Sequence, residues 1–388
     1  MSVLIGAGLS TELDPLAAAS EAARVAAQGL DGAEADLVLV FAAGANLAAP
    51  EAMLEGVHAE LAPRVLVGCG AGGVLGSGRE LESGTALAVW AASFGGAGEV
   101  RPFHARLDDQ SPEPVLEGMP SPGRSSRVIL LSDPYSFPTE AVLSALADEA
   151  PGVPVLGGLS SGRTPEGTAA LFIDDTLCEQ GAVGVCLDGI EMLPCVSQGA
   201  APLGREVTIT AAQDNIVYEL AGRPAIETIE TIIGELPIHQ RALVAAGLLI
   251  GIVIDGGKPD YEQGDFLVRG VLGADSNSGA IAIGAGVSEG QVVRLHARDA
   301  RSADEDLRQE LRVRAQALAG SYPAGVLIFS CNGRGQAMFG PCDHDVTLVE
   351  QELNGAPNAG FFAAGEIGPV GGRSFLHGFT ATVAVFPG

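Results

Sequence analysis

The feature that most constrains the fold is a pattern of strands and a helix that occurs three times along the 388-residue chain. In each copy an apolar run predicts a buried strand, a stretch of helical periodicity predicts a helix, and a second apolar run follows. The predicted helices cover residues 50–61, 139–149 and 343–353, and a third apolar run comes later, at residues 86–91, 169–173 and 380–386. Two glycines with four residues between them follow the start of each second strand: Gly68 and Gly73, Gly157 and Gly162, Gly360 and Gly365. The chain is therefore predicted to contain an internal βαββ repeat.

The helix between the first two strands of each copy predicts a right-handed crossover, so these two strands are expected to be parallel. Loops that follow parallel strands gather at their carboxyl ends, where open α/β sheets bind ligands. The three glycine loops are thus expected to share one site. A plainer interpretation is that the glycines only make tight turns, because the chain contains 54 of them.

Length and pattern together predict an α/β protein of two domains. A chain of 388 residues is long enough for two hydrophobic cores. The repeat pattern breaks in the segment QGAAPLGRE, residues 198–206, so the predicted domains are residues 1–200 and 201–388. Each is expected to be a mixed sheet covered by helices and built from βαββ units. A strongly amphipathic helix is predicted over residues 303–319, with Ser302 as its N-cap.

Composition argues against two classes of partner. The net charge is −27, with 48 acidic residues against twenty arginines and one lysine, Lys258. A chain this acidic repels nucleic acid and anionic lipid, so we expect neither as a partner. The amino terminus lacks the basic segment of a signal peptide, and the longest apolar run, residues 242–254, is too short to span a bilayer. These features predict a cytoplasmic protein.

Metal and nucleotide sites have no support in the sequence. The six cysteines contain no C-x2-C pair, and the six histidines are scattered. Zinc sites need clusters of such ligands, so no metal is predicted. The glycine loops match neither the dinucleotide pattern G-x-G-x-x-G nor the phosphate-binding pattern G-x4-G-K-[ST], both of which lead into a helix. We therefore expect no cofactor.

Three segments of the chain resemble one known family. GCGAGG at residues 68–73 resembles the N-terminal FIST domain, while FSCNGRG at residues 329–335 and GEIGP at residues 365–369 resemble its C-terminal partner, FIST C. The resemblance covers roughly residues 30–385. It implies a sensory module of signal transduction that binds small molecules such as amino acids. Because the sequence shows no kinase, cyclase, helix-turn-helix or F-box segment, the resemblance also implies a separately encoded signalling protein as partner.

Arg334 and Glu366 are the leading candidates for ligand binding. In a chain with few cations, a guanidinium on a glycine-rich loop can hold a ligand carboxylate through two hydrogen bonds. Glu366, in the other loop of the last copy, can receive the amino group of an amino-acid ligand. The alternative is structural, with Arg334 paired to one of the many acids or to Glu366 itself.

Cys331 is the candidate nucleophile for an enzyme. It follows a strand and lies near Arg334, which can lower its thiol pKa, and His344 or His377 can supply a base. Such an enzyme would use Cys331, His344 and Glu366. The alternative for Cys331, and also for Cys69, is the packing role that small buried thiols usually have. By the same resemblance, His344 and His377 are candidate axial ligands of haem, since some FIST-type proteins are reported as gas sensors.

Other polar residues end the strands of the remaining copies and complete the predicted ligand site. Ser160 and Ser161 can offer hydroxyl and backbone N–H groups to an anion, although serines in turns have these features without a ligand. The further candidates are Cys69, Asn46, Asp133 and Asn332.

The function we predict is non-catalytic binding of a small polar ligand, such as an amino acid, by a cytoplasmic sensory module. Two other classes stay open. One is a Cys331-dependent enzyme acting on a small substrate. The other is a structural or interaction protein whose loops pack against each other or against a neighbour.

Overall fold

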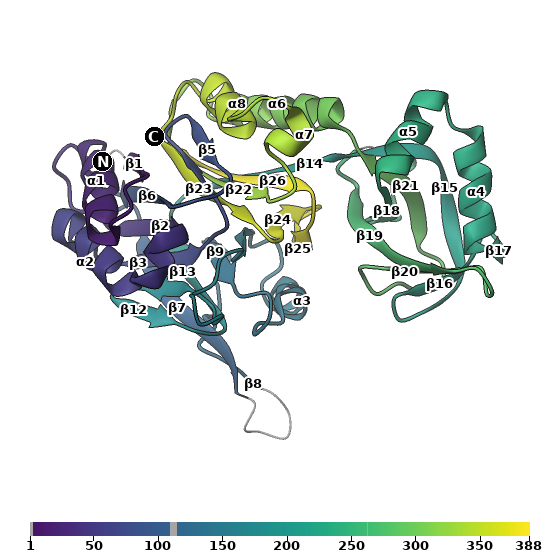
Figure 1. Cartoon of the computed structure of the whole chain (residues 1–388), viewed down its shortest axis with the longest axis horizontal. Helices are drawn as coiled ribbons and strands as arrows, with labels where there is room; N and C mark the ends of the chain where they lie inside the picture. Colours follow the sequence, from purple (N-terminus) through teal and green to yellow (C-terminus); the bar gives the residue numbers. More distant parts are fainter. Residues whose placement is uncertain (1–2, 109–114, 262) are drawn as a thin grey trace. The chain divides into compact units, whose positions relative to one another are not determined.

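The computed structural model describes residues 3–108, 115–261 and 263–388, and the chain divides into two compact units (Figure 1). The first unit consists of Met1–Val196, Leu307–Leu376 and Ala381–Gly388. The second consists of Ser197–Asp306 and His377–Thr380. Mixed sheets with helices packed against them confirm the predicted α/β class.

The first unit contains three sheets with different sequences and the same arrangement of strands. The first sheet has the order β1 (Leu4–Ser10), β6 (Ala86–Ser93), β2 (Leu37–Ala43), β3 (Leu66–Gly70), β11 (Leu171–Ile173), β12 (Thr176–Cys178). The second has the order β8 (Val115–Glu117), β7 (Glu99–Asp108), β13 (Ala182–Asp188), β9 (Ser126–Ser132), β10 (Val155–Leu159), β24 (Glu366–Val370), β25 (Arg373–His377). The third has the order β14 (Leu193–Gln198), β26 (Thr380–Pro387), β22 (Pro323–Cys331), β23 (Asn358–Ala363), β4 (Val74–Gly76), β5 (Arg79–Leu81).

Each sheet is built around one parallel pair, and these pairs are the predicted ones. β2 is parallel to β3, β9 to β10, and β22 to β23. The connecting helices are α2 (Pro50–Leu61), α3 (Thr139–Glu149) and α8 (His344–Glu352), close to their predicted bounds. The strand beside the first member of each pair is antiparallel to it and closes the copy; these strands are β6, β13 and β26. The internal βαββ repeat is therefore confirmed.

The three copies exchange hairpins in a cycle, which the sequence did not predict. The hairpin of β4 and β5 follows β3 in the chain but pairs with β23 of the third copy. The hairpin that begins with β11 follows β10 and pairs with β3, and the one that begins with β24 follows β23 and pairs with β10. The expectation that residues 169–173 close the second copy is wrong, because β11 belongs to the first sheet and β13 closes the second.

The three sheets share one hydrophobic core on their inner faces. The rings of Phe41 on β2, Phe329 on β22 and Phe361 on β23 meet there, with centroids 5.2 to 6.3 Å apart. The outer faces are covered by helices: α1 (Pro15–Gln28) and α2 on the first sheet, α3 on the second, and α6 (Ala300–Ala317) and α8 on the third (Figure 1). Strands buried on both faces explain the continuous apolar runs of the sequence.

Close contact between parallel strands accounts for the first glycine of each repeated pair. Each of these glycines lies in the second strand, opposite a residue of the first strand, and a side chain would strike that residue's carbonyl oxygen. A Cβ would lie 2.2 Å from the oxygen of Val40 at Gly68, 1.9 Å from that of Leu130 at Gly157, and 1.7 Å from that of Ile328 at Gly360. Van der Waals contact needs more than 3 Å, so only glycine fits at these positions.

The second unit is an antiparallel sheet whose strand pairings close into a ring. Its order is β15 (Ala200–Gln213), β21 (Val292–Arg298), β18 (Leu248–Val253), β19 (Phe266–Asp275), β20 (Ala280–Ile283), β16 (Ile216–Leu220) and β17 (Arg223–Pro224). β15 pairs with β21 over its first half and with β16 over its second half, which closes the ring. The helices α4 (Ala225–Glu235) and α5 (Ile238–Ala246) pack against this sheet, and α4 buries Ile229 and Ile232 in its core.

The second unit interrupts the third copy of the repeat, between β14 and α6. The compact units therefore divide the chain differently from the predicted domains 1–200 and 201–388. Residues after 306 return to the first unit because β22, β23 and β26 form one sheet with β4 and β5. The prediction of Ser302 as N-cap is wrong: α6 begins at Ala300, and the side chain of Asp299 accepts the N–H of Ser302 at 3.2 Å.

No helix in the described part of the chain combines the length and the apolar character that crossing a bilayer requires.

Candidate functional site

The three glycine loops meet in the first unit, at the carboxyl ends of the three parallel strand pairs. We call residues 70–73, 159–162 and 362–365 the loop junction. Each loop is joined to another by a backbone hydrogen bond: Gly162 N–H to Gly70 O (3.1 Å), Phe362 N–H to Gly73 O (3.0 Å), and Leu159 N–H to Gly365 O (2.8 Å). The hairpin exchange produces this arrangement, because each loop leads into a hairpin of a neighbouring sheet. The expectation that these loops come together is confirmed by these bonds.

Both predicted serines lie in the loop junction and join one loop to another. The hydroxyl of Ser160 donates to the carbonyl oxygens of Gly70 (2.7 Å) and Gly162 (3.0 Å). The hydroxyl of Ser161 donates to the carbonyl oxygen of Phe362 and accepts the N–H of Gly72 at 2.9 Å. Ser160 is buried, while Ser161 and Gly72 reach the surface. These hydroxyls therefore stabilise the junction itself.

A buried ion pair lies just beyond the end of β22. The guanidinium of Arg334 donates from Nε to Oδ2 of Asp345 and from Nη2 to Oδ1, each at 2.8 Å. The two side chains are 0% and 2% exposed. Asp345 lies in the first turn of α8 and also accepts the hydroxyl of Ser330 at 2.7 Å. A bidentate pair of this kind fixes the loop after β22 to the start of α8.

Sequence reasoning found Arg334 but not Asp345, its partner. Asp345 also lies 2.9 Å from Nδ1 of His344, whose ring stacks on Phe339 of the short helix α7 (Gln336–Phe339) with centroids 3.5 Å apart. Burial disfavours the charged form of Asp345, but the charge and hydrogen bonds of Arg334 outweigh it and hold the pKa of that carboxyl well below its usual range. Both members of the pair are therefore ionised at neutral pH.

Arg334 keeps one donor without an acceptor. Its third nitrogen, Nη1, is buried and has no hydrogen-bond partner in the described part of the chain. Buried donors of this kind are rare in folded proteins, since each loses its bond to water without replacement.

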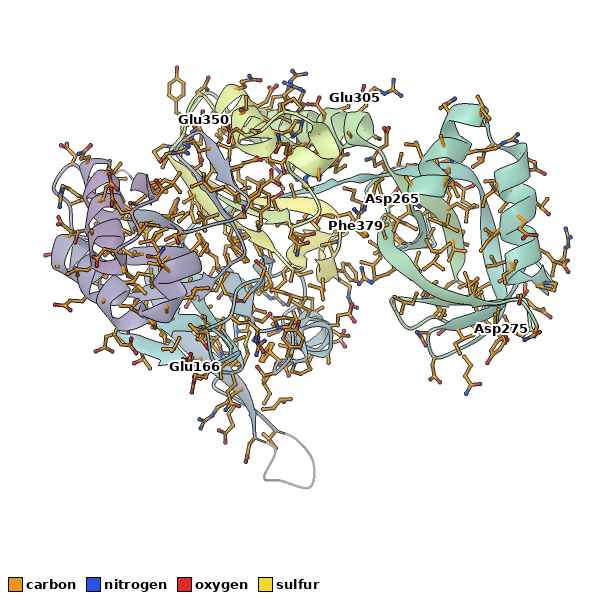
Figure 2. All side chains as sticks on the ribbon, in the orientation of Figure 1. Glu166, Asp265, Asp275, Glu305, Glu350 and Phe379 are labelled. Atoms are coloured by element: carbon orange, nitrogen blue, oxygen red, sulfur yellow. The ribbon has the colours of Figure 1, made fainter. Side chains whose placement is uncertain are left out.

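Two further buried carboxylates belong to this neighbourhood, since Glu366 acts on Arg334 and Glu80 acts on Asp345. Among the described residues, the buried acids are Glu80, Asp133, Asp345 and Glu366. Acids such as Glu166, Asp275 and Glu305 are instead exposed at turns and on helix surfaces (Figure 2). Burial opposes the charged form of Arg334, but the pKa of the guanidinium is raised by Asp345 and, to a smaller extent, by the charges of Cys331 and Glu366. The structure thus brings together Arg334, Glu366 and Cys331, as the sequence predicted, and adds Asp345.

Glu80 comes to this cluster from the exchanged hairpin of the first copy. Its Oε1 accepts the N–H of Val346 at 3.0 Å, in the first turn of α8. Burial raises the pKa of Glu80 to about 7, and the charge of Asp345 acts in the same direction. A hairpin that closes onto a distant sheet gives no local sequence signal, so this residue was missed.

Cys331 and Asn332 lie where β22 enters the loop. Cys331 is 6% exposed, and its Sγ accepts the N–H of Gly333 at 3.4 Å. Asn332 is exposed, and its N–H donates to the carbonyl of Ala363 at 2.9 Å, which ties it to the loop junction. Glu366, at the other side of the same copy, is fully buried at the start of β24, where it pairs with Gly158.

The remaining candidates have local partners. Asn46, in a 3-10 turn (Gly44–Ala48), is buried and donates to the carbonyls of Ala43 (3.1 Å) and Ala86 (3.0 Å). Asp133 is buried and bonded to Arg163 at 2.8 Å. These contacts fix the ends of β2 and β9.

Cys69 and His377 are also buried. Burial alone raises the pKa of the Cys69 thiol far above its ordinary value, which keeps it protonated. His377, at the end of β25, is 4% exposed. No group of three or more His, Cys, Asp or Glu suited to a metal ion occurs among the residues that the structure describes.

Two known domain families match the sequence of this chain. Residues 36–223 match the FIST N domain and residues 225–369 match the FIST C domain, which together cover most of the chain. The chain belongs to the FIST family. FIST domains form a sensory family of signal transduction. The boundary between the two FIST domains falls inside the second compact unit, at Pro224, the last residue before α4.

Relatives of similar length occur in mycobacteria. "Uncharacterized protein Rv0628c" of Mycobacterium tuberculosis strain H37Rv is 41% identical over 383 residues, which is 98% of this FIST chain and 99% of the relative. "Uncharacterized protein Mb0898c" of Mycobacterium bovis is 40% identical over 384 residues, 98% of each chain. The similarity therefore extends over nearly the full length of this chain and of both relatives.

Proposed function

We propose that this FIST protein is a non-catalytic sensor that binds a small zwitterion, such as an amino acid, beside the loop junction. The observation that carries the proposal is the buried Nη1 of Arg334, which has no acceptor among the described residues. A ligand carboxylate supplies that acceptor. The position of the site at the carboxyl ends of three parallel strand pairs supports the same conclusion.

The charge of the cluster selects the class of ligand. One guanidinium, Arg334, interacts with two buried carboxylates, those of Asp345 and Glu366, and a third, Glu80, lies beside Asp345. A simple anion adds negative charge to a site that already has an excess of it, whereas a zwitterion brings an ammonium group as well. In this proposal the ligand carboxylate meets Nη1 of Arg334, its ammonium meets Glu366, and the exposed side-chain amide of Asn332 forms a further hydrogen bond to the ligand.

We assign sensing rather than chemistry to the site, and signalling to a separately encoded partner protein. A cytoplasmic location is part of the proposal, because all six cysteines are free thiols, as the reducing cytoplasm maintains them.

The test is thermal melting of the intact protein with amino acids, with the matching carboxylic acids that lack the amino group, and with haem. A ligand at a hundredfold excess over its Kd stabilises the protein by about 2.7 kcal/mol. We expect a shift with one or a few amino acids and a smaller one with the deaminated acids. Asn332→Ala, an exposed change at the junction, should reduce the shift, and Gln316→Ala, an exposed amide on α6, should not. An unchanged midpoint with every amino acid would contradict the proposal.

A second candidate is an enzyme that uses Cys331. One observation favours it: the sulfur accepts the N–H of Gly333 and lies within electrostatic range of Arg334, and both features stabilise a thiolate. The rate of alkylation by iodoacetamide, followed by peptide mass spectrometry between pH 5 and 9, separates the two candidates. Fast modification of Cys331 at pH 6 supports the enzyme, and a rate no faster than that of the exposed Cys342 removes it.

A further inference from the structure

The second unit contains a cavity whose described lining lies entirely within that unit. Its volume is about 420 Å³, and β15, α5 and the residues around the start of α6 line it. Pro202 and Leu203 of β15 and Leu243 of α5 form an apolar wall. The rest of the lining is polar, from His239, Gln240, Asp299, Arg301 and Ser302. An apolar wall beside polar groups that can fix a ligand's orientation is a feature of small-molecule sites.

Arg301 supplies the polar group that defines the ligand. It lines the cavity, and the described part of the chain offers it no ion pair or hydrogen bond. Other arginines of this unit are engaged: Arg294 bonds Glu206 at 2.8 Å, and Arg241 donates to the carbonyl of Leu236 at 2.8 Å. In a chain with 48 acidic residues, a guanidinium left uncommitted on a cavity wall is available to an external anion.

The opposite charge in the lining sets the charge of the ligand. Asp299 also lines the cavity, with its Oδ2 held by the N–H of Ser302 at 3.2 Å. A ligand beside Arg301 therefore lies near one fixed carboxylate. A single negative charge is tolerated there better than the double charge of phosphate, and the apolar wall favours a short hydrocarbon chain.

We propose that this cavity is a second binding site, specific for a short-chain monocarboxylate whose carboxylate pairs with Arg301. Its hydrocarbon chain packs on Leu203 and Leu243. The site lies outside the loop junction, and a ligand can bind here whether or not one binds beside the loop junction. The second unit, which interrupts a repeat that is otherwise complete, thereby adds a separate input to the sensor.

The test is ligand-detected saturation-transfer NMR on the intact protein, with a titration that gives the Kd of butyrate. Butylamine, of the same length and opposite charge, and inorganic phosphate are the comparison probes. The informative variant is Arg301→Gln, on an exposed residue at the start of α6. The matched control is Arg223→Gln, which removes the same charge from an exposed arginine elsewhere in the second unit.

We expect butyrate to bind and its Kd to rise at least tenfold in Arg301→Gln, with no change in Arg223→Gln or in Asn332→Ala. Butylamine and phosphate should give weaker transfer. The proposal is overturned if butyrate does not bind, if Arg301→Gln binds it as tightly as the parent protein, or if butylamine binds better. A loss of butyrate binding in Asn332→Ala but not in Arg301→Gln would assign butyrate to the loop junction instead.

Discussion

The two units bury polar groups in opposite ways. The first unit holds an ionised pair, Arg334 and Asp345, in the third copy of the repeat, with the buried Glu80 from a hairpin of the first copy beside it. The second unit holds a neutral imidazole: His296 is 0% exposed, with Nδ1 3.1 Å from the carbonyl of Arg294 and its ring edge-on to Phe266. Burial lowers the pKa of His296 to about 4.

The difference follows from how each unit is connected. In the first unit a strand end, a helix start and a hairpin from another copy must be joined, and charged hydrogen bonds join them with fixed geometry. In the second unit neighbouring strands close a ring through backbone bonds, so a buried side chain needs only to fill space. Gly251 provides that space, since a Cβ there would lie 2.3 Å from the His296 ring.

The largest expected effect is on the ion pair. Arg334→Met leaves the carboxylate of Asp345 buried without its partner, and should destabilise the first unit by about 3 to 5 kcal/mol. Urea unfolding followed by fluorescence of Trp90 measures this, because the single tryptophan is buried in β6 of the first unit. Arg24→Met, at an exposed pair with Glu60 in the first unit, should change stability by less than about 0.5 kcal/mol. A loss below about 1 kcal/mol for Arg334→Met would show that the pair does not hold the loop after β22 to the start of α8.

The second effect concerns the contact between parallel strands. Gly360→Ala places a Cβ 1.7 Å from the carbonyl oxygen of Ile328, so the strands must separate, and we expect a loss of about 3 kcal/mol or more. Gly270→Ala in β19 is the control, since a Cβ there meets nothing within 4 Å. Trp90 fluorescence reports the first change and circular dichroism the second. Equal effects of the two changes would contradict a special role for the repeated glycine.

The third effect is on the second unit at acid pH. The folded pKa of His296, about 4, lies below the ordinary value of 6.5, so the unfolded chain binds the proton more tightly. Stability is therefore full above pH 6.5 and falls as the pH drops toward 4, by about 3 kcal/mol. Hydrogen exchange of β18 and β21 peptides, measured by mass spectrometry from pH 7 to pH 4.5, follows this unit alone. Opening free energies of these strands that do not change with pH would argue against a neutral buried histidine.

The fourth effect has the opposite sign and belongs to the first unit. The folded pKa of Glu80, about 7, lies above its ordinary value of 4.5, so stability is full below pH 4.5 and is lost as the pH rises through 7. Between pH 5.5 and pH 8 we expect the first unit to lose about 2 kcal/mol. Glu80→Gln keeps an oxygen for the N–H of Val346 and should abolish the slope in Trp90-detected unfolding. The same slope in the variant would assign the titration to another group.

The repeat itself was predictable because its cause is local. The helices at residues 50–61, 139–149 and 343–353 have clear periodicity, and the first glycine of each pair is required by the strand beside it. The hairpin exchange was not predictable, because the short strand Val74–Gly76 is equally compatible with any sheet edge. The insertion of the second unit was missed for a similar reason, since β14 and α6 give no sign that they belong to one copy.

The candidate site was predictable in part. Arg334 stands out in a cation-poor chain, and Glu366 and Cys331 lie at recognisable strand ends. Asp345 was missed because several acids occur nearby and only the helix turn decides which one faces the arginine. One signal was available: Asp345 immediately precedes the buried Val346 in the amphipathic helix, so it lies at the edge of the inward face.

The most direct test of the central claim, a zwitterion bound beside the loop junction, is a calorimetric titration with the amino acid that gives the largest melting shift. Parent protein, Asn332→Ala and Gln316→Ala are titrated side by side. We expect one site per chain, a Kd at least tenfold higher in Asn332→Ala, and an unchanged Kd in Gln316→Ala. Equal affinity in all three proteins, or no heat with any amino acid, would contradict it.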